Sequence, residues 1–115
     1  MDFEKFRKEL EAKRVKYTGF AISSDEKKAL PIGSHYFKCI FDDVEGGKDV
    51  FGYYRTFKDA VKASKAYAKI ELEYFYGEEF DIYEYEVTRD EEGNFKGHLV
   101  AKYTNDLSFK FNRYQ

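Results

Sequence analysis

The chain has 115 residues, which is enough to bury a core that is stable without cross-links, so we expect a single domain over residues 1–115. Hydrophobic residues make up 43% of it and aromatic residues 20%, which excludes a disordered protein and leaves the 37% of charged residues for a solvated surface. The formal net charge is −2, but residues 70–92 alone carry ten acidic side chains and one Arg. Such a concentration of one sign favours partners of the opposite sign.

Cysteine usage and hydropathy indicate where the protein works. Cys39 is the single cysteine and has no internal partner for a disulfide. The sequence shows no amino-terminal run of the signal-peptide type and no stretch of about 18 apolar residues that would span a membrane. We therefore expect a cytoplasmic protein without a membrane role.

The first half of the chain predicts a helix followed by strands. An Asp cap and apolar residues at helical spacing predict a helix over residues 3–14. A short strand near residues 19–22 leads into a predicted loop, Ser23 to Ser34, which holds the only proline. Alternating aromatic and polar residues over 35–44 and 50–56, on either side of a Gly-Gly pair, predict a β-hairpin.

The second half predicts one long helix and three more strands. Apolar residues recur at helical spacing from Lys58 to about Tyr76, and Gly77 is expected to end this helix. Residues 80–88, 95–104 and 107–114 predict strands joined by polar turns. The predicted order is α-β-β-β-α-β-β-β, an α+β fold with two helices packed on an antiparallel sheet.

Catalytic and metal-binding residues are few. His35 and Cys39 share a face of a predicted strand but stand about 13 Å apart, too far for a thiolate–imidazole pair. His98 is the remaining candidate, and a buried structural cysteine is the commoner alternative to a nucleophile. The sequence has no metal-ligand spacing and no phosphate-binding glycine loop, so we expect neither catalysis nor a metal or other cofactor.

Four lysines on the second predicted helix offer a nucleic-acid interface. Lys58, Lys62, Lys65 and Lys69 fall along one outer face, which predicts either a phosphate-contacting stripe or simply a solvated surface. With the loop that ends PIGSHYF and the order α-β-β-β-α over residues 2–76, this region resembles the double-stranded RNA-binding domain. The resemblance implies RNA contacts at Lys58, Lys62 and His35, although the helix opens TFKDAVKAS and three further strands follow.

The stretch that follows Gly77 combines rings with carboxylates. Phe80, Ile82, Glu84 and Glu86 are expected on one face of its strand, and the alternate residues on the other. Because neither face is purely apolar, we predict an edge strand or a partly exposed one. Glu71, in the apolar arc of the preceding helix, is expected to extend this surface where the helix outruns the sheet.

Carboxylates beside tyrosines suit cationic side chains, which gain ion pairs from the acids and cation–π contacts from the rings. The bland alternative is that edge charges only prevent aggregation. The sequence therefore predicts a non-catalytic module that docks on a basic surface of a partner protein, one that itself binds nucleic acid being an obvious candidate. In size and charge layout alone, the chain resembles small acidic inhibitors of phages and mobile elements. The predicted partner-binding residues are Glu71, Tyr74, Glu78, Glu79, Asp81, Tyr83, Glu84, Tyr85 and Glu86.

Overall fold

The structure is a computed structural model that describes residues 21–43, 47–71, 80–105 and 110–114. The predicted helix over residues 3–14 and the predicted helix end at Gly77 lie outside this part of the chain. Within it the elements are β1 (Ala21–Ile22), α2 (Ser24–Lys28), β2 (His35–Asp43), β3 (Gly47–Tyr54), α3 (Phe57–Glu71), β4 (Phe80–Arg89), β5 (Phe95–Asn105) and β6 (Phe111–Tyr114).

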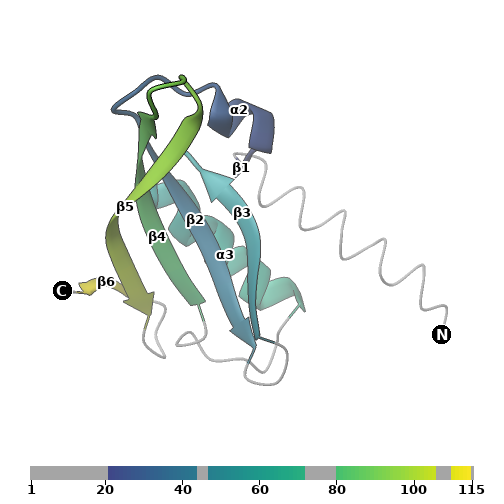
Figure 1. The fold of residues 1–115 in the computed structure, drawn as a ribbon. Helices are drawn as coiled ribbons and strands as arrows, with labels where there is room; N and C mark the ends of the chain where they lie inside the picture. The colour runs from purple at the N-terminus through teal and green to yellow at the C-terminus, as the bar shows by residue number, and fades with distance from the viewer. Residues whose placement is uncertain (1–20, 44–46, 72–79, 106–109, 115) are drawn as a thin grey trace, which may run out of the picture.

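The strands form one antiparallel sheet in the order β1-β3-β2-β4-β5-β6 (Figure 1). β2 and β3 pair antiparallel as far as Asp43 and Gly47, as the predicted hairpin requires, and Gly47 has a φ of 90°, which favours glycine. After α3 the chain returns on the far side of β2, so that β2 lies between β3 and β4. The described residues thus confirm an α+β fold with a six-stranded antiparallel sheet and two helices.

Two sequence predictions are corrected by this topology. The strand after Gly77 is β4, which lies between β2 and β5, so the edge position that was one of the two expectations is wrong; the other expectation, a partly exposed strand, agrees with the structure, because most residues of β4 are only partly buried. Carboxylates are tolerated on this central strand because they keep access to water on both faces: Asp81, Glu84 and Glu86 are all only partly buried. The predicted loop Ser23 to Ser34 contains α2, which a capping box starts: the Ser23 hydroxyl accepts from the Glu26 N–H, and the Glu26 carboxylate accepts from the Ser23 N–H.

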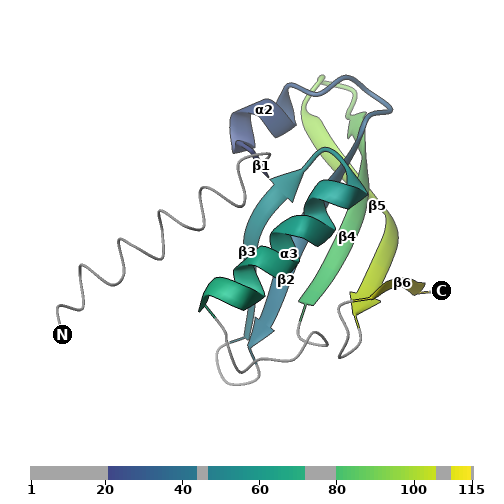
Figure 2. The same ribbon diagram turned by 180° about the vertical axis from the view of Figure 1, so that it is seen from behind.

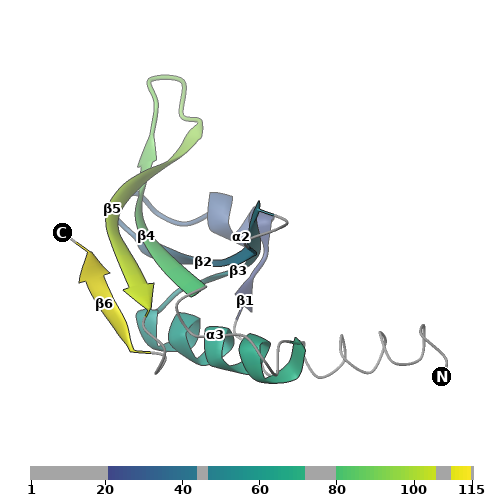
Figure 3. The same cartoon turned by 90° about the horizontal axis from the view of Figure 1, so that it is seen from below.

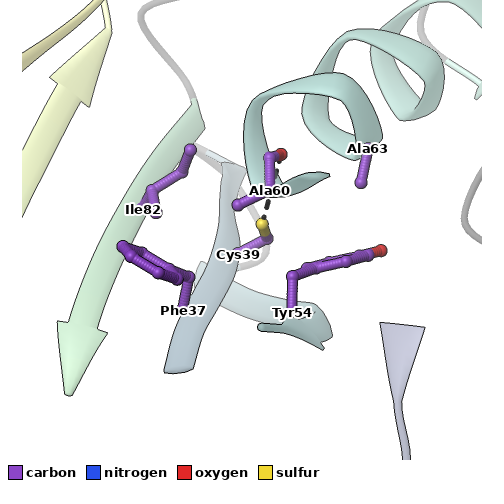
Figure 4. Packing of buried hydrophobic residues seen from close by; sticks show 6 residues of the cluster. All are labelled: Phe37, Cys39, Tyr54, Ala60, Ala63 and Ile82. Atoms are coloured by element: carbon purple, nitrogen blue, oxygen red, sulfur yellow. Dashed lines mark hydrogen bonds between the residues drawn. The ribbon is translucent and has the colours of Figure 1, made fainter. Parts of the chain in front are cut away.

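The main core lies between α3 and one face of the sheet (Figure 2). Small residues on α3, Ala60 and Ala63, let the helix approach the strands closely, and both are buried. They pack against side chains of three adjacent strands, drawn in Figure 4: Phe37, Cys39, Tyr54 and Ile82. A second cluster, built on Phe41, Ala68 and Phe80, continues this core along the helix.

A smaller core lies on the opposite face, near α2. Leu30, in the loop after α2, packs there with Tyr36 and Val87. Tyr36 stacks on Tyr85 with ring centroids 5.2 Å apart, and its hydroxyl lies over Gly97, where a Cβ atom would come within 2.1 Å of the oxygen. The two helices therefore lie on opposite sides of the sheet, as Figure 3 shows, and α2 covers only one end of its face.

No helix among the described residues is long and apolar enough to cross a membrane.

Candidate binding surfaces

Strand β4 divides the predicted partner-binding residues between the two faces of the sheet. Glu84 and Glu86 lie on the face that α3 packs against. The cross-strand partner of Glu84 is Phe37, which belongs to the core under α3, and Glu86 follows two residues later on the same face. Asp81, Tyr83 and Tyr85 lie on the opposite face, which we call the open face. Of the remaining members, Tyr74, Glu78 and Glu79 lie outside the described residues, and Glu71 is the last residue of α3.

Glu84 is hydrogen-bonded through both of its carboxylate oxygens. It shares a 2.6 Å hydrogen bond between its Oε2 and His35 Nδ1, and its Oε1 accepts a 2.7 Å bond from the Tyr103 hydroxyl. Burial alone would raise the pKa of Glu84, but these bonds and the positive charges of His35 and Arg113 outweigh it and hold the pKa below its usual value. The Glu84 carboxylate is therefore ionised at neutral pH, and its side chain is 17% exposed.

His35, which the RNA-binding resemblance named as a contact residue, is the partner of Glu84 in this bond. The ring is oriented by a carboxylate of the protein itself and is 42% exposed. Glu86 lies between His35 on β2 and His98 on β5, since both histidines are its cross-strand partners. Nevertheless, the described residues contain no group of three His, Cys, Asp or Glu side chains placed to hold a metal ion.

Cys39 is positioned as a core residue. Its Sγ lies 3.5 Å from the Ala60 carbonyl oxygen, to which it donates, and the side chain is buried (Figure 4). Burial raises the pKa of the Cys39 thiol to about 12, with a smaller opposing effect from Ser64. The thiolate needed for nucleophilic attack is thus scarce at neutral pH.

The open face combines tyrosines with lysines. Lys38 Nζ lies 5.0 Å from the ring centroid of Tyr85 and 5.5 Å from that of Tyr83, and Lys102 Nζ lies 5.2 Å from Tyr83 on its other side. Near α2, Lys27 Nζ lies 3.9 Å from the Tyr53 ring. Tyr83 and Tyr85, two of the three tyrosines that were predicted to meet cations of a partner, thus have lysines of this chain over their rings.

Asp81, a carboxylate of the predicted set, lies on the open face near the start of β4. Burial raises the pKa of Asp81, and Asp42 raises it further, while Lys48 and Lys102 oppose the change. The open face also carries two exposed aliphatic side chains: Val50 on β3 is 47% exposed, and Leu99 on β5 is 37% exposed. Both are large for solvated strand positions, so aliphatic area adds to the tyrosines of this face.

The lysines of the predicted stripe lie on α3. Lys58, Lys62 and Lys65 are exposed, in keeping with either a phosphate-contacting stripe or a solvated helix face. Lys69 lies in the same helix, but its side chain is outside the described set. The region that resembles the double-stranded RNA-binding domain also includes the three strands before α3. These strands do not pair in chain order, because β3 lies between β1 and β2.

Sequence reasoning missed Lys38 and Lys102 as functional candidates. Lys38 alternates with Phe37 and Cys39 in β2, so its face was readable, but its cross-strand neighbours were not. Those neighbours depend on the pairing of β2 with β4, strands that are separated by a hairpin and a helix. A tyrosine–lysine row becomes visible only when that register is known.

Comparisons with models of protein families, with curated proteins and with solved structures find no match for this chain.

Proposed function

We propose that the protein is a non-catalytic binding module that docks on a basic surface of a partner protein. The docking surface is the acidic end of β4, by which we mean Glu84 and Glu86 on the helix-covered face and Glu91 and Glu92 in the turn that follows. Glu91 and Glu92 are exposed and Glu86 is half-buried. Of the residues that the sequence predicted for docking, this surface keeps Glu84 and Glu86 and leaves out Asp81, Tyr83 and Tyr85, which lie on the open face.

The observation that carries this proposal is the immobilised carboxylate of Glu84. Hydrogen bonds from two neighbouring strands hold it in one orientation, and its lowered pKa keeps it ionised. Glu86 projects on the same side two residues later, at a separation of about 6.7 Å along the strand. A binding group that is already ordered loses little entropy on association, which favours affinity for a partner's arginines and lysines.

The partner class follows from the same geometry. A strand that presents carboxylates at regular intervals offers a basic protein a row of negative charge, as the backbone of a nucleic acid does. A nucleic-acid-binding protein is therefore the partner that fits best, and the module would compete with its nucleic acid. The contact should weaken as the salt concentration rises, because its charges lie at the surface.

The test is an affinity capture from lysate with the purified full chain, followed by titration calorimetry with the captured partner. The informative variant is Glu86→Lys, because changing Glu84 would also break its bonds to His35 and Tyr103. The matched control is Lys65→Glu, a charge reversal on the exposed side of α3. We expect a salt-sensitive partner that resists nuclease, is lost with Glu86→Lys and is kept with Lys65→Glu.

Two results would overturn the proposal. One is a partner that binds the Glu86→Lys variant as tightly as the unchanged protein. The other is recovery of nucleic acid alone, with binding abolished by Lys62→Glu and Lys65→Glu together, which would favour the α3 lysines as the interface.

A further inference from the structure

We propose that the open face of the sheet is a second binding site, which takes single-stranded nucleic acid. The site is an alternating row across four strands: Tyr53 on β3, Lys38 on β2, Tyr83 on β4 and Lys102 on β5. Each member is the direct cross-strand partner of the next. We call it the tyrosine–lysine row, and it is separate from the acidic end of β4 that carries the proposed function.

No described helix or strand covers the middle of the row, and only its first member, Tyr53, has a side chain of α2 over its ring, that of Lys27. Among the described elements, α3 packs on the other face, and α2 with its loop covers the end around Leu30 and Val87. Figure 1 looks onto the open face and shows no described helix in front of the middle of β2 and β4. Neighbouring strands are about 4.8 Å apart, so the row of four residues spans about 14 Å. This is room for a short segment of an extended ligand.

The chemistry of the row matches both parts of a nucleotide. Tyrosine rings on an open surface accept stacked bases of any sequence, and lysines beside them neutralise phosphates. Tyr83 has a lysine on each side, with Lys38 Nζ at 5.5 Å and Lys102 Nζ at 5.2 Å from its ring centroid. Cation–π contacts at exposed sites are weak, so an arriving base and phosphate can displace the ammonium groups from the rings.

The surroundings indicate the path of the ligand. Asp81 and Asp42 lie on one side of the row, toward the start of β4 and the end of β2, and repel phosphates there. Tyr85 lies on the opposite side of the row. Its ring centroid is 5.0 Å from Lys38 Nζ, and its ring is stacked on the buried Tyr36, which fixes it in place. A strand of nucleic acid therefore lies across the sheet along the row, with Tyr85 as an additional stacking surface.

Single strands fit this surface better than duplexes or proteins do. The rings can stack only on bases that are unpaired, and a duplex offers none along its length. Protein interfaces are depleted of lysine at their centre, whereas this surface has Lys38 there. Lysines at the centre and carboxylates confined to one side match a polyanion with planar groups.

The test is fluorescence anisotropy with the full chain and a labelled 12-nucleotide single strand of either DNA or RNA, compared with a duplex of the same length. We expect saturable binding of the single strand and weaker binding of the duplex. Tyr83→Leu keeps the bulk of the side chain but removes the ring, and should weaken binding about tenfold. Lys38→Gln should weaken it and reduce the slope of log K against log salt by about 0.7.

The controls separate this site from the other surfaces. Lys65→Gln on α3 should leave binding of the single strand unchanged, and Glu86→Lys should not weaken it. Circular dichroism should show that each variant stays folded. A polyglutamate peptide of equal charge should bind less tightly than the single strand, because it has no rings to stack.

Several outcomes would overturn the inference. They are absence of saturable binding, equal affinity for the duplex, and binding that survives Tyr83→Leu but is lost with Lys65→Gln. Equal affinity for polyglutamate would instead assign the row to an acidic protein. None of these results bears on the partner capture with Glu86→Lys, so failure of one proposal is distinguishable from failure of the other.

Discussion

The helix-covered face and the open face of the sheet are made from alternate residues of the same strands, but they contain different kinds of contact. Under α3, Phe37, Cys39 and Ile82 are buried in a continuous apolar core. On the open face, the side chains at neighbouring positions of the same strands, Lys38 and Tyr83, are only partly buried and contact each other. Coverage by α3 thus buries these three residues, whereas the alternate positions Lys38 and Tyr83 stay partly exposed, even though β4 itself shows no clean division of polarity.

The largest expected effect tests this division directly on β4. Ile82→Ala should lower the free energy of unfolding by about 2–5 kcal/mol, because it opens a cavity at a fully buried side chain. The adjacent Tyr83→Ala should cost less than about 1.5 kcal/mol, since that ring is partly solvated and its cation–π contacts are weak. Urea denaturation followed by circular dichroism gives both values. Equal losses at the two positions would mean that the open face is as tightly packed as the core.

Much of the fold was readable because it depends on local patterns. The predicted strand starts at Phe80 and Phe95 are those of β4 and β5, and α3 begins at Phe57, one residue before the predicted start, while its predicted end lies outside the described residues. The turn between β4 and β5 was readable for the same reason: Asp90 accepts from the Glu92 and Asn94 N–H groups, and Gly93 has a φ of 83°. α2 was predictable in principle, since Ser23 and Glu26 have capping-box spacing.

The surfaces were less predictable because they depend on pairing between distant strands. The aromatic and acidic composition of β4 drew attention to this strand, but its neighbouring strands decide the contacts of each side chain. The partner of Glu84 is His35, 49 residues earlier, and the partner of Tyr83 on the open face is Lys38. Nothing local in the sequence specifies that β2 has β4 beside it, because α3 intervenes between β3 and β4.

The next prediction concerns the packing of the open face near α2. Gly97→Ala should destabilise the protein by about 1–3 kcal/mol, because the new methyl group would collide with the buried Tyr36 and disturb its stacking on Tyr85. Tyr36→Phe removes the hydroxyl nearest to that methyl group. In a double-mutant cycle measured by urea denaturation, Gly97→Ala should therefore cost less in the Tyr36→Phe background. An equal cost in both backgrounds would show that the hydroxyl does not limit the space at Gly97.

A smaller effect should appear as a pH dependence on the helix-covered face. The pKa of Glu84 is lowered in the folded protein, so its ionised form stabilises the fold above the unfolded-state pKa, and this contribution is lost as the pH falls through the folded pKa. Glu84→Gln should therefore cost about 1 kcal/mol at pH 7 and progressively less below about pH 4.5. The measurement is the free energy of unfolding of both proteins across this range. Glu91→Gln, at an exposed turn position, is the control and should show no such trend.

The smallest effect should have the opposite sign and lie on the open face. Burial raises the pKa of Asp81, so its ionised form is unfavourable in the folded protein, and the associated cost is present above the folded pKa and disappears as the pH falls below the unfolded one. Asp81→Asn removes the charge and should raise the free energy of unfolding at pH 7 by up to about 0.5 kcal/mol, a small value because Lys48 and Lys102 already offset part of the cost. Urea denaturation at pH 7 and pH 3 checks the sign, since the gain should vanish at the lower pH. A loss of stability at pH 7 would mean that the two lysines more than compensate for burial, and that Asp81 belongs to the open face as an ion-pair partner rather than as an isolated charge.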